Sequence, residues 1–365
     1  MSRKLFRSTI LLLLVLAMTA CATPAPDVPA PEAQTALETP GIVGDEAATA
    51  SVPFDSQGHR GARGLRPENT LPAFETALDL GVTTLELDLH FSADDQVVIW
   101  HDPVIDPAKC RINPAASLPL PDPDDPNTAL ADLALRSLTA QQLAAYLCDR
   151  NPDPSRFPDQ TTQPTALAGQ DFGIVTLARL FDFVDAYAGD PAKSEAQRTN
   201  AAQVRFNIET KRKFDQPQAI GDGFDGTTPG PFELAILELV QARGLADRVV
   251  IQSFDHRSLW AVHSVAPEMT LAVLISRAAR GNELAEWAQA GASIFSPNAT
   301  RLTAATVIQA HEAGLTVIPW TVNDPADMRR LIDMGVDGLI SDRPDLLVDL
   351  LVDLLGNLAG TESRE

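Results

Sequence analysis

Strand-like and helix-like segments alternate along almost the whole chain, from residue 54 to residue 355. This alternation predicts an α/β fold with a parallel sheet, because parallel neighbouring strands need a long crossover that a helix usually supplies. The predicted strands are Phe54–Gly58, Thr84–His90, Gln96–Trp100, Gln203–Ile208, Arg248–Gln252, Thr270–Ile275, Ala292–Phe295, Leu315–Trp320 and Gly338–Ser341. The predicted helices include Leu71–Leu80, Leu177–Tyr187, Phe232–Arg243, Arg257–Val265, Asn282–Ala290, Ala304–Ala313, Ala326–Met334 and Pro344–Leu355.

The predicted strands exceed by one the eight strands of a (β/α)₈ barrel. Residues 92–95 separate the second strand from the third and are too few for a crossover helix, so we expect a hairpin-like irregularity there. The prediction is an irregular (β/α)₈ TIM barrel over residues 53–356, followed by a tail over residues 357–365. An open doubly wound sheet is the alternative, but no glycine-rich phosphate loop opens a helix in this sequence.

Residues 103–171 interrupt the alternation. This stretch is rich in proline and aspartate, contains Cys110 and Cys148, and has helical spacing only over Leu138–Leu147. Structureless loops of this length inside compact domains are usually either functional or wrongly assigned. We therefore interpret the stretch as an insertion after the third strand, lying over the mouth of the barrel.

The N-terminus has the pattern of an export signal. Three basic residues precede a short apolar run over residues 10–17, which is followed by Cys21. The run is shorter than the roughly 20 residues that span a bilayer. Residues 1–20 resemble a bacterial lipoprotein signal, with Cys21 as the lipidated residue. Cleavage with release of the protein and an uncleaved anchor are the alternatives.

Residues 21–52 are rich in alanine, proline, threonine and glutamate and have no apolar period, so we expect a flexible tether. A lipid anchor would hold the protein on a membrane facing the periplasm or the cell exterior, and Ala22 after the cysteine favours the outer membrane. In such an oxidising compartment Cys110 and Cys148 can form a disulfide. Two free buried thiols are the alternative.

The chain is acidic, with a formal net charge of −21. Nucleic acids and anionic lipid surfaces are bound by an excess of lysine and arginine, so neither is an expected partner. A small anionic substrate remains compatible with this composition, because a local cationic pocket can lie in an acidic protein. The sequence indicates no oligomeric state.

Acidic residues cluster on two of the predicted strands. Glu86 and Asp88 are two residues apart on one strand and therefore point to the same face. Glu209 adds a third carboxylate at the end of another strand. Buried carboxylates need positive compensation, and three of them suit one Ca²⁺ or Mg²⁺ ion better than zinc. Taken alone, a Glu-x-Asp pair on a strand is usually a solvated face, and this is the alternative for Glu86 and Asp88.

Histidines and cations follow the same strands. His59 and His101 stand at strand ends, where barrel enzymes carry catalytic groups, and imidazole titrates near neutral pH. Lys211 shares a face with Glu209, so it either contacts a substrate anion or forms only an ion pair. Trp320 is either an apolar wall for a substrate or part of the barrel core. His90 shares a face with Asp88 and either lines the site or lies on the surface.

Together these residues belong to an ordered series of motifs. The series is His59-Arg60-Gly61, Pro67-Glu68-Asn69-Thr70, Glu86-Leu87-Asp88, His101-Asp102, Ile208-Glu209-Thr210-Lys211, Gln252-Ser253-Phe254-Asp255, Trp320-Thr321-Val322-Asn323, Gly335-Val336-Asp337-Gly338 and Ser341-Asp342-Arg343-Pro344. Over residues 57–352 it resembles the glycerophosphodiester phosphodiesterase family. Pro67–Thr70, taken alone, is also explained as a helix cap with Asn69 or Thr70 as the N-cap.

The resemblance implies an irregular TIM barrel of the phospholipase-C-like type and hydrolysis of glycerophosphodiesters to sn-glycerol 3-phosphate and an alcohol. It also implies attack by the substrate's own glycerol 2-hydroxyl, with direct attack by water as the alternative. The residues that match functional positions are Glu86, Asp88 and Glu209 for a divalent cation, His59 and His101 for acid–base catalysis, and Arg60 and Lys211 for phosphate.

Two further classes of function compete with this prediction. Phospholipase C- or D-like action on intact lipids would need an apolar mouth, whereas the insertion has little aromatic material. A binding lipoprotein without catalysis predicts that at least one of the two histidines and three carboxylates is missing, and all five are present.

Overall fold

The computed structural model of the protein describes residues 54–362, with side chains as far as residue 355. The predicted signal peptide, the lipidation site Cys21, the tether and residues 363–365 lie outside this described part. Within it, none of the helices combines the length and the apolar character that crossing a membrane requires.

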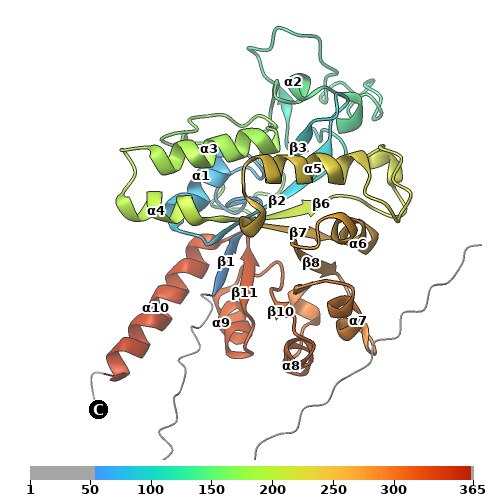
Figure 1. Ribbon diagram of the computed structural model, residues 1–365. Coiled ribbons are helices and arrows are strands. Elements are labelled where there is room, and N and C mark those ends of the chain that lie inside the picture. The colour runs from blue at the N-terminus through green and yellow to red at the C-terminus, as the bar shows by residue number, and fades with distance from the viewer. Residues whose placement is uncertain (1–53, 363–365) are drawn as a thin grey trace, which may run out of the picture. The chain divides into compact units, whose positions relative to one another are not determined.

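Eight parallel strands in the described residues form a nearly closed barrel surrounded by helices (Figure 1). They are β1 (Asp55–Gly58), β2 (Thr84–Phe91), β6 (Arg205–Thr210), β7 (Val249–Ser253), β8 (Thr270–Ile275), β9 (Ile294–Pro297), β10 (Thr316–Val317) and β11 (Gly338–Ser341). The neighbours run β10, β9, β8, β7, β6, β2, β1, β11. The Asp337 amide donates to the Val317 carbonyl (2.9 Å) and joins the two ends. The TIM-barrel prediction is confirmed.

One strand stands outside the parallel barrel. β3 (Val97–Ile99) pairs antiparallel with β2, with Leu89 opposite Ile99. The turn between them spans only a few residues, as expected for a hairpin. The ninth predicted strand is thus the predicted hairpin-like irregularity.

Most of the predicted helices form close to their expected bounds. The α-helices are α1 (Leu71–Leu80), α2 (Ala140–Leu143), α3 (Leu177–Gly189), α4 (Glu195–Gln203), α5 (Pro231–Ala242), α6 (His256–Val265), α7 (Glu283–Gln289), α8 (Ala304–Glu312), α9 (Pro325–Asp333) and α10 (Pro344–Glu362). Short 3₁₀ helices are η1 (Leu135–Ser137), η2 (Pro217–Ala219), η3 (Ala246–Arg248) and η4 (Ala299–Arg301).

Two helices outside the insertion differ from the prediction. The sequence of α4 has no apolar stripe and buries only Ala201, so periodicity does not reveal it. It begins instead at a capping box, in which Ser194 accepts from the Gln197 amide and the Gln197 side chain accepts from the Ser194 amide. α10 continues to Glu362, so residues that were predicted to form a tail are helical.

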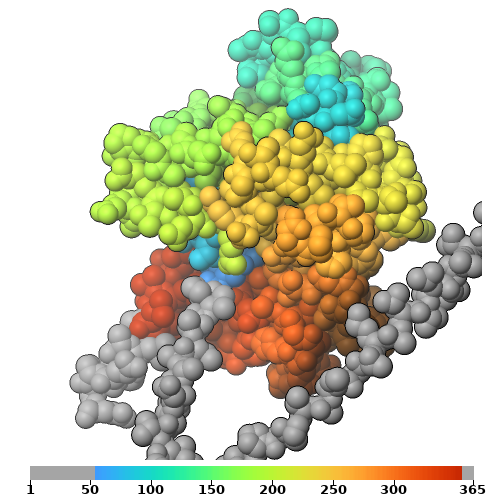
Figure 2. All heavy atoms as spheres, viewed as in Figure 1, coloured from blue at the N-terminus to red at the C-terminus, as the bar shows by residue number. Residues whose placement is uncertain are grey.

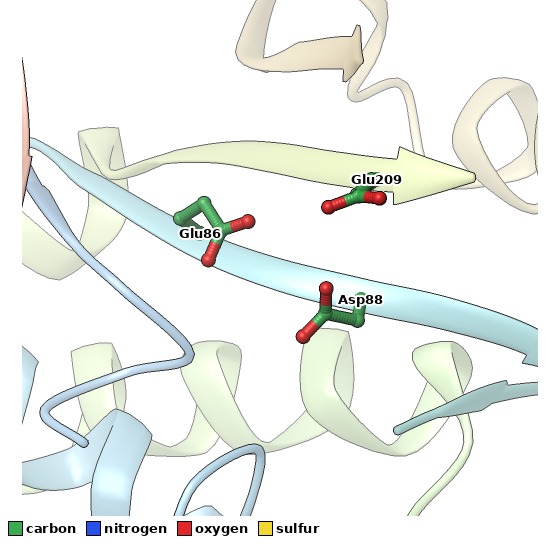
Figure 3. Close-up of side chains that lie close together, drawn as sticks. All are labelled: Glu86, Asp88 and Glu209. Carbon is green, nitrogen blue, oxygen red and sulfur yellow. The ribbon is translucent and has the colours of Figure 1, made fainter. Parts of the chain in front are cut away.

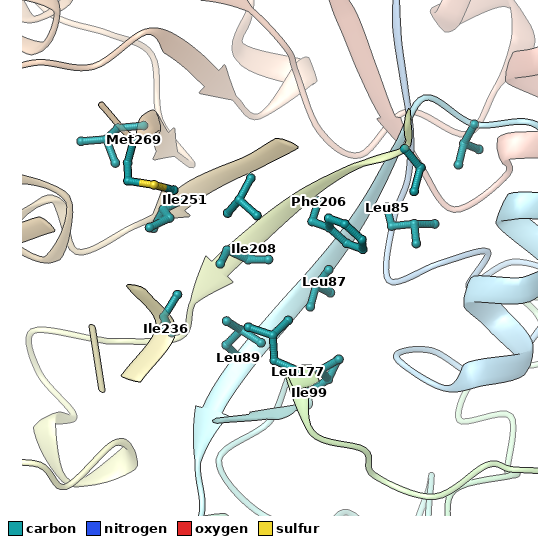
Figure 4. Close-up of a cluster of buried hydrophobic side chains, with 14 of the residues drawn as sticks. Leu85, Leu87, Leu89, Ile99, Leu177, Phe206, Ile208, Ile236, Ile251 and Met269 are labelled. Carbon is teal, nitrogen blue, oxygen red and sulfur yellow. The ribbon is translucent and has the colours of Figure 1, made fainter. Parts of the chain in front are cut away.

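Strand alternation divides β2 between the outer core and the barrel interior. Leu85, Leu87 and Leu89 pack outward among apolar side chains of the surrounding helices (Figure 4). Glu86 and Asp88 lie between them in sequence and point the other way. Parallel pairing with β6 places Asp88 opposite Glu209, so three acids meet inside the barrel.

Leu87→Ala should lower the free energy of unfolding by about 2–5 kcal/mol, because it removes a fully buried side chain from this outer core. Urea unfolding followed by circular dichroism measures the change. Leu234→Ala, which truncates a half-exposed leucine on α5, is the control and should change stability by no more than about 0.5 kcal/mol. An equal loss in both variants would contradict the assignment of Leu87 to the core.

The insertion has a core of its own. β4 (Arg111–Ile112) pairs antiparallel with β5 (Tyr146–Leu147), so the helix predicted over Leu138–Leu147 is shortened to α2 and its end becomes a strand. The teal atoms of the insertion project as a lobe (Figure 2). Val98, Trp100 and Ile174 contribute to this core from the flanking segments, and the insertion itself contributes Ile105, Cys110, Leu133, Leu135, Leu138, Leu143, Tyr146 and Cys148. Within this core Cys110 and Cys148 form a disulfide.

Candidate active site

Three carboxylates converge inside the barrel. Glu86 and Asp88 come from β2 and Glu209 comes from β6 (Figure 3). One oxygen from each carboxylate lies within 4.8 Å of the others, and all three side chains are buried. The alternative of a solvated strand face for Glu86 and Asp88 is therefore wrong.

The protein's own cations neutralise this cluster unevenly. Burial, together with the charges of Asp88 and Glu209, raises the pKa of the Glu86 carboxyl well above its usual range. Burial also raises the pKa of Glu209, although Lys211 opposes the shift. The protein's own cations thus stabilise the charged forms of Glu86 and Glu209 only incompletely. A hard divalent cation such as Ca²⁺ or Mg²⁺ fits this donor set and this charge.

Two basic side chains border the cluster on the side of Asp88. The Arg60 guanidinium lies 3.1 Å from one Asp88 oxygen, and the Lys211 ammonium lies 3.2 Å from the other. Although burial disfavours the charged carboxylate, these cations hold the pKa of Asp88 well below its usual range. Arg60 adopts a left-handed backbone (φ 52°), and its amide donates to Glu86 Oε2 at 2.9 Å. One residue thus contacts two of the three acids.

Both predicted histidines are held by carboxylates through Nδ1. His59 Nδ1 lies 2.6 Å from Asp342 Oδ1, and His101 Nδ1 lies 2.8 Å from Asp102 Oδ1. An Nδ1–H that is donated to a carboxylate leaves Nε2 free to accept a proton. Burial lowers the pKa of His59 to about 4 against the opposing effect of Asp342, so this imidazole is neutral at physiological pH.

A cavity of about 420 Å³ opens beside these groups. Its polar wall includes both histidines, and its apolar wall includes Phe254 and Trp320, whose rings meet edge to face at 5.4 Å. The Trp320 indole also donates to the Ser296 carbonyl at 2.9 Å, which fixes the ring at the cavity wall. The predicted site residues of the barrel, including Arg60 and Lys211, therefore all border one cavity or the carboxylates beneath it.

Several further polar residues lie around the site, and the sequence patterns indicate no role for them. Thr70 occupies the N-cap position of α1, but its hydroxyl donates to the Pro67 carbonyl (2.7 Å) and caps no amide. Asn69 donates to Asp88 Oδ2 (2.8 Å), and Glu68 accepts from Arg60 (2.9 Å). The available signal was the Pro67–Thr70 motif directly before α1, which the cap interpretation explained without a role in the site.

Two other supporting residues come from β7 and from the end of β11. Gln252 Nε2 donates to Glu86 Oε1 at 2.7 Å, which orients this carboxylate from β7. Asp342, just after β11, accepts from Arg63 as well as contacting His59. His90 is buried with Nε2 3.2 Å from the His101 carbonyl, so the surface alternative for His90 is wrong.

Comparison with known proteins agrees with this arrangement. The model of the glycerophosphoryl diester phosphodiesterase family matches residues 59–346. The uncharacterized protein YqiK of Bacillus subtilis is 27% identical over 79% of this chain and 94% of its own length. A glycerophosphodiester phosphodiesterase of Caldanaerobacter subterraneus is 25% identical over 80% of this chain and 95% of its own length.

Solved structures share the fold. A putative glycerophosphoryl diester phosphodiesterase from Silicibacter pomeroyi superimposes with a TM-score of 0.65 at 27% identity, covering 83% of this chain and 94% of the other. An Oleispira antarctica phosphodiesterase, solved with the product sn-glycerol-3-phosphate, has a TM-score of 0.58 at 17% identity and covers 81% and 96%. Because the family model spans most of the chain and the site is complete, this protein belongs to the glycerophosphoryl diester phosphodiesterase family of hydrolases.

Proposed function

We propose that the protein hydrolyses small, water-soluble glycerophosphodiesters to sn-glycerol 3-phosphate and an alcohol with the help of one divalent cation. The observation that carries the proposal is that a cluster of carboxylates and a pair of histidines meet at one cavity. Glu86, Asp88 and Glu209 form a cation site, and two carboxylate-held histidines stand beside it. The phosphodiesterase in complex with sn-glycerol-3-phosphate has the same fold and supports this choice of product.

The cationic side chains would bind the phosphodiester. This anion repels an incoming nucleophile, so its non-bridging oxygens need positive partners. Arg60 and Lys211 are buried and border the cavity, and they can share their charge between Asp88 and a bound phosphate. When bound, Ca²⁺ or Mg²⁺ would supply further stabilisation of the charge that develops on the phosphoryl oxygens.

The two histidines would move the protons. One neutral imidazole removes the proton of the attacking hydroxyl, and the other, protonated, delivers a proton to the departing alcohol oxygen. We infer that the attacking group is the glycerol 2-hydroxyl, which forms a new P–O bond as the bond to the alcohol breaks. The resulting cyclic phosphate is then opened by water, with the histidine roles exchanged. A cyclic phosphate detected by ³¹P NMR during turnover would support this route over direct attack by water.

The substrate we propose is a deacylated head-group diester. The cavity of about 420 Å³ has a charged floor, and its aromatic lining is confined to a few side chains such as Phe254 and Trp320. A glycerol unit fits against this lining, whereas two acyl chains would need a larger apolar surface.

We also propose export and membrane anchoring through Cys21. The support is the sequence pattern of residues 1–20 together with the disulfide between Cys110 and Cys148, since disulfides persist in oxidising compartments. We expect labelled fatty acid to enter the wild-type protein in bacterial cells, and expect Cys21→Ser to abolish labelling. Labelling of the Cys21→Ser protein would contradict the proposal.

Removal and return of metal tests the proposed reaction. Purified protein treated with EDTA should release no glycerol 3-phosphate from glycerophosphocholine, glycerophosphoethanolamine or glycerophosphoglycerol, and added Ca²⁺ or Mg²⁺ should restore release. The ion that restores release is identified as the cofactor. The relative rates on the three diesters rank the head groups. Turnover that is unaffected by EDTA would contradict the metal site. Release of products only from phosphatidylcholine vesicles would establish a phospholipase instead.

A further inference from the structure

A chain of alternating charges joins the outer nitrogens of the two site histidines. Each member contacts the next within the described residues, and the members alternate between acid and base. In order they are His59, Asp342 (2.6 Å), Arg63 (2.8 Å), Glu68 (3.3 Å), Lys109 (2.8 Å), Asp102 and His101 (2.8 Å). We call this set the charge chain.

Within the charge chain, Lys109 alone comes from the insertion. Its ammonium is largely buried and bridges Glu68 Oε1 and Asp102 Oδ2. The other oxygen of Asp102 faces His101 Nδ1. Among the described residues, Asp102 has no ion-pair partner besides Lys109 and His101. Lys109 and His101 therefore contact the two different oxygens of the Asp102 carboxylate.

The geometry points to Lys109 as a positioning residue for His101 that acts through Asp102. With one oxygen held by Lys109, the Asp102 carboxylate presents its other oxygen to His101 Nδ1. This contact keeps the proton on Nδ1 and turns Nε2 toward the cavity, as a carboxylate does for a catalytic imidazole elsewhere. The inference deepens the proposed function and rests on it, since it requires that His101 transfer a proton.

The fold of the insertion holds Lys109 in place from its backbone. The Lys109 amide donates to the Asp106 carbonyl (3.0 Å), and the Lys109 carbonyl accepts from the Arg150 amide (3.0 Å). The next residue, Cys110, is fully buried and is bonded to Cys148 in the core of the insertion. The disulfide is thus a covalent cross-link directly beside Lys109 in the sequence, and it anchors the segment that carries the ammonium.

Lys109 also borders the cavity, so direct binding of substrate is the competing role. Its ammonium contacts Glu68 and Asp102, and the kinetic effect of removing it separates the two roles. A positioning role changes kcat, because the proton transfer becomes slower, whereas a substrate contact made equally before and during reaction changes KM.

We expect Lys109→Ala to lower kcat for the best glycerophosphodiester by about tenfold to a hundredfold, a part of the 10²–10⁴-fold that acid–base catalysis contributes. KM should stay nearly unchanged, and Lys109→Arg should restore most of the lost kcat. Arg111→Ala is the matched control, because Arg111 flanks the same disulfide but pairs with Asp149 away from the charge chain. A rise in KM at constant kcat would overturn the positioning role.

A double-mutant cycle separates positioning from a general structural role. In a His101→Ala background, Lys109→Ala should cause no further loss of turnover, because the group that it positions is gone. Multiplied losses in the double variant would overturn the inference. Near-ultraviolet circular dichroism of each variant checks that the insertion remains folded.

The Cys110→Ser/Cys148→Ser variant tests whether the disulfide holds Lys109 in place. We expect its kcat to fall toward that of Lys109→Ala, and expect no additional loss when Lys109→Ala is added. Wild-type kcat in this variant would overturn the tethering role of the disulfide. Failure of the proposed function is distinct from all these outcomes, because the wild-type protein itself would then release no glycerol 3-phosphate.

Discussion

Glu86→Ala is expected to abolish metal-dependent release of glycerol 3-phosphate, lowering kcat by at least about 10²–10³-fold, as loss of a central electrostatic stabiliser does. Glu86 is one of the three oxygen donors inside the barrel, and its carboxylate is oriented by Gln252 and by the Arg60 amide. Without it, two carboxylates remain, and Arg60 and Lys211 already neutralise one of them. Steady-state kinetics in excess Ca²⁺ or Mg²⁺ measure the loss of kcat, and calorimetric titration of the ion measures the loss of metal affinity.

Glu238→Ala is the control for this experiment, because Glu238 is an exposed acid on α5 away from the cavity. Its kcat and its affinity for metal should match those of the wild-type protein. Far-ultraviolet circular dichroism should show that Glu86→Ala remains folded. Full turnover by folded Glu86→Ala protein would contradict the assignment of the carboxylates to a metal.

His59→Ala is expected to lower kcat by about 10²–10⁴-fold, the usual contribution of a general acid or base. Burial keeps His59 neutral near pH 7, and its Nδ1 is held by Asp342, so its Nε2 is the group placed to accept a proton. KM should change much less than kcat, because Arg60 and Lys211 would still bind the phosphate. The readout is initial rates over a range of substrate concentrations at pH 7.

His311→Ala provides a matched control for the loss of an imidazole. His311 also contacts a carboxylate, with Nε2 2.9 Å from Asp337, but both side chains lie on the surface. We expect kcat and KM of this variant to equal the wild-type values. If His59→Ala were equally active while remaining folded, the acid–base assignment would be wrong.

The barrel could be predicted because its signals are local. Alternation over β2 reports a buried face at Leu85, Leu87 and Leu89 and an opposite face at Glu86 and Asp88, since each residue's direction follows from its parity. The short link between β2 and β3 likewise required a hairpin. Helix α4 was not predicted, because it has no apolar stripe and its start is set by a capping box.

The insertion could not be predicted in the same way. β4 and β5 each have two residues, and Arg111 pairs with Leu147 across the whole length of the intervening loop. Such pairing depends on the shared core and on the disulfide, and neither leaves a period in the sequence. The sequence did indicate a functional insertion that carries two cysteines able to form a disulfide.

The sequence by itself determined the parallel barrel, the cluster of three acids and the two histidines, because each depends on strand parity or on a motif of adjacent residues. Only the tertiary structure decided what orients these groups. Asp342 reaches His59 across 283 residues of sequence, and Glu68 reaches Lys109 across 41. Contacts of this kind form when distant strand ends meet at one barrel mouth, and the spacing of residues along a chain carries no record of that meeting.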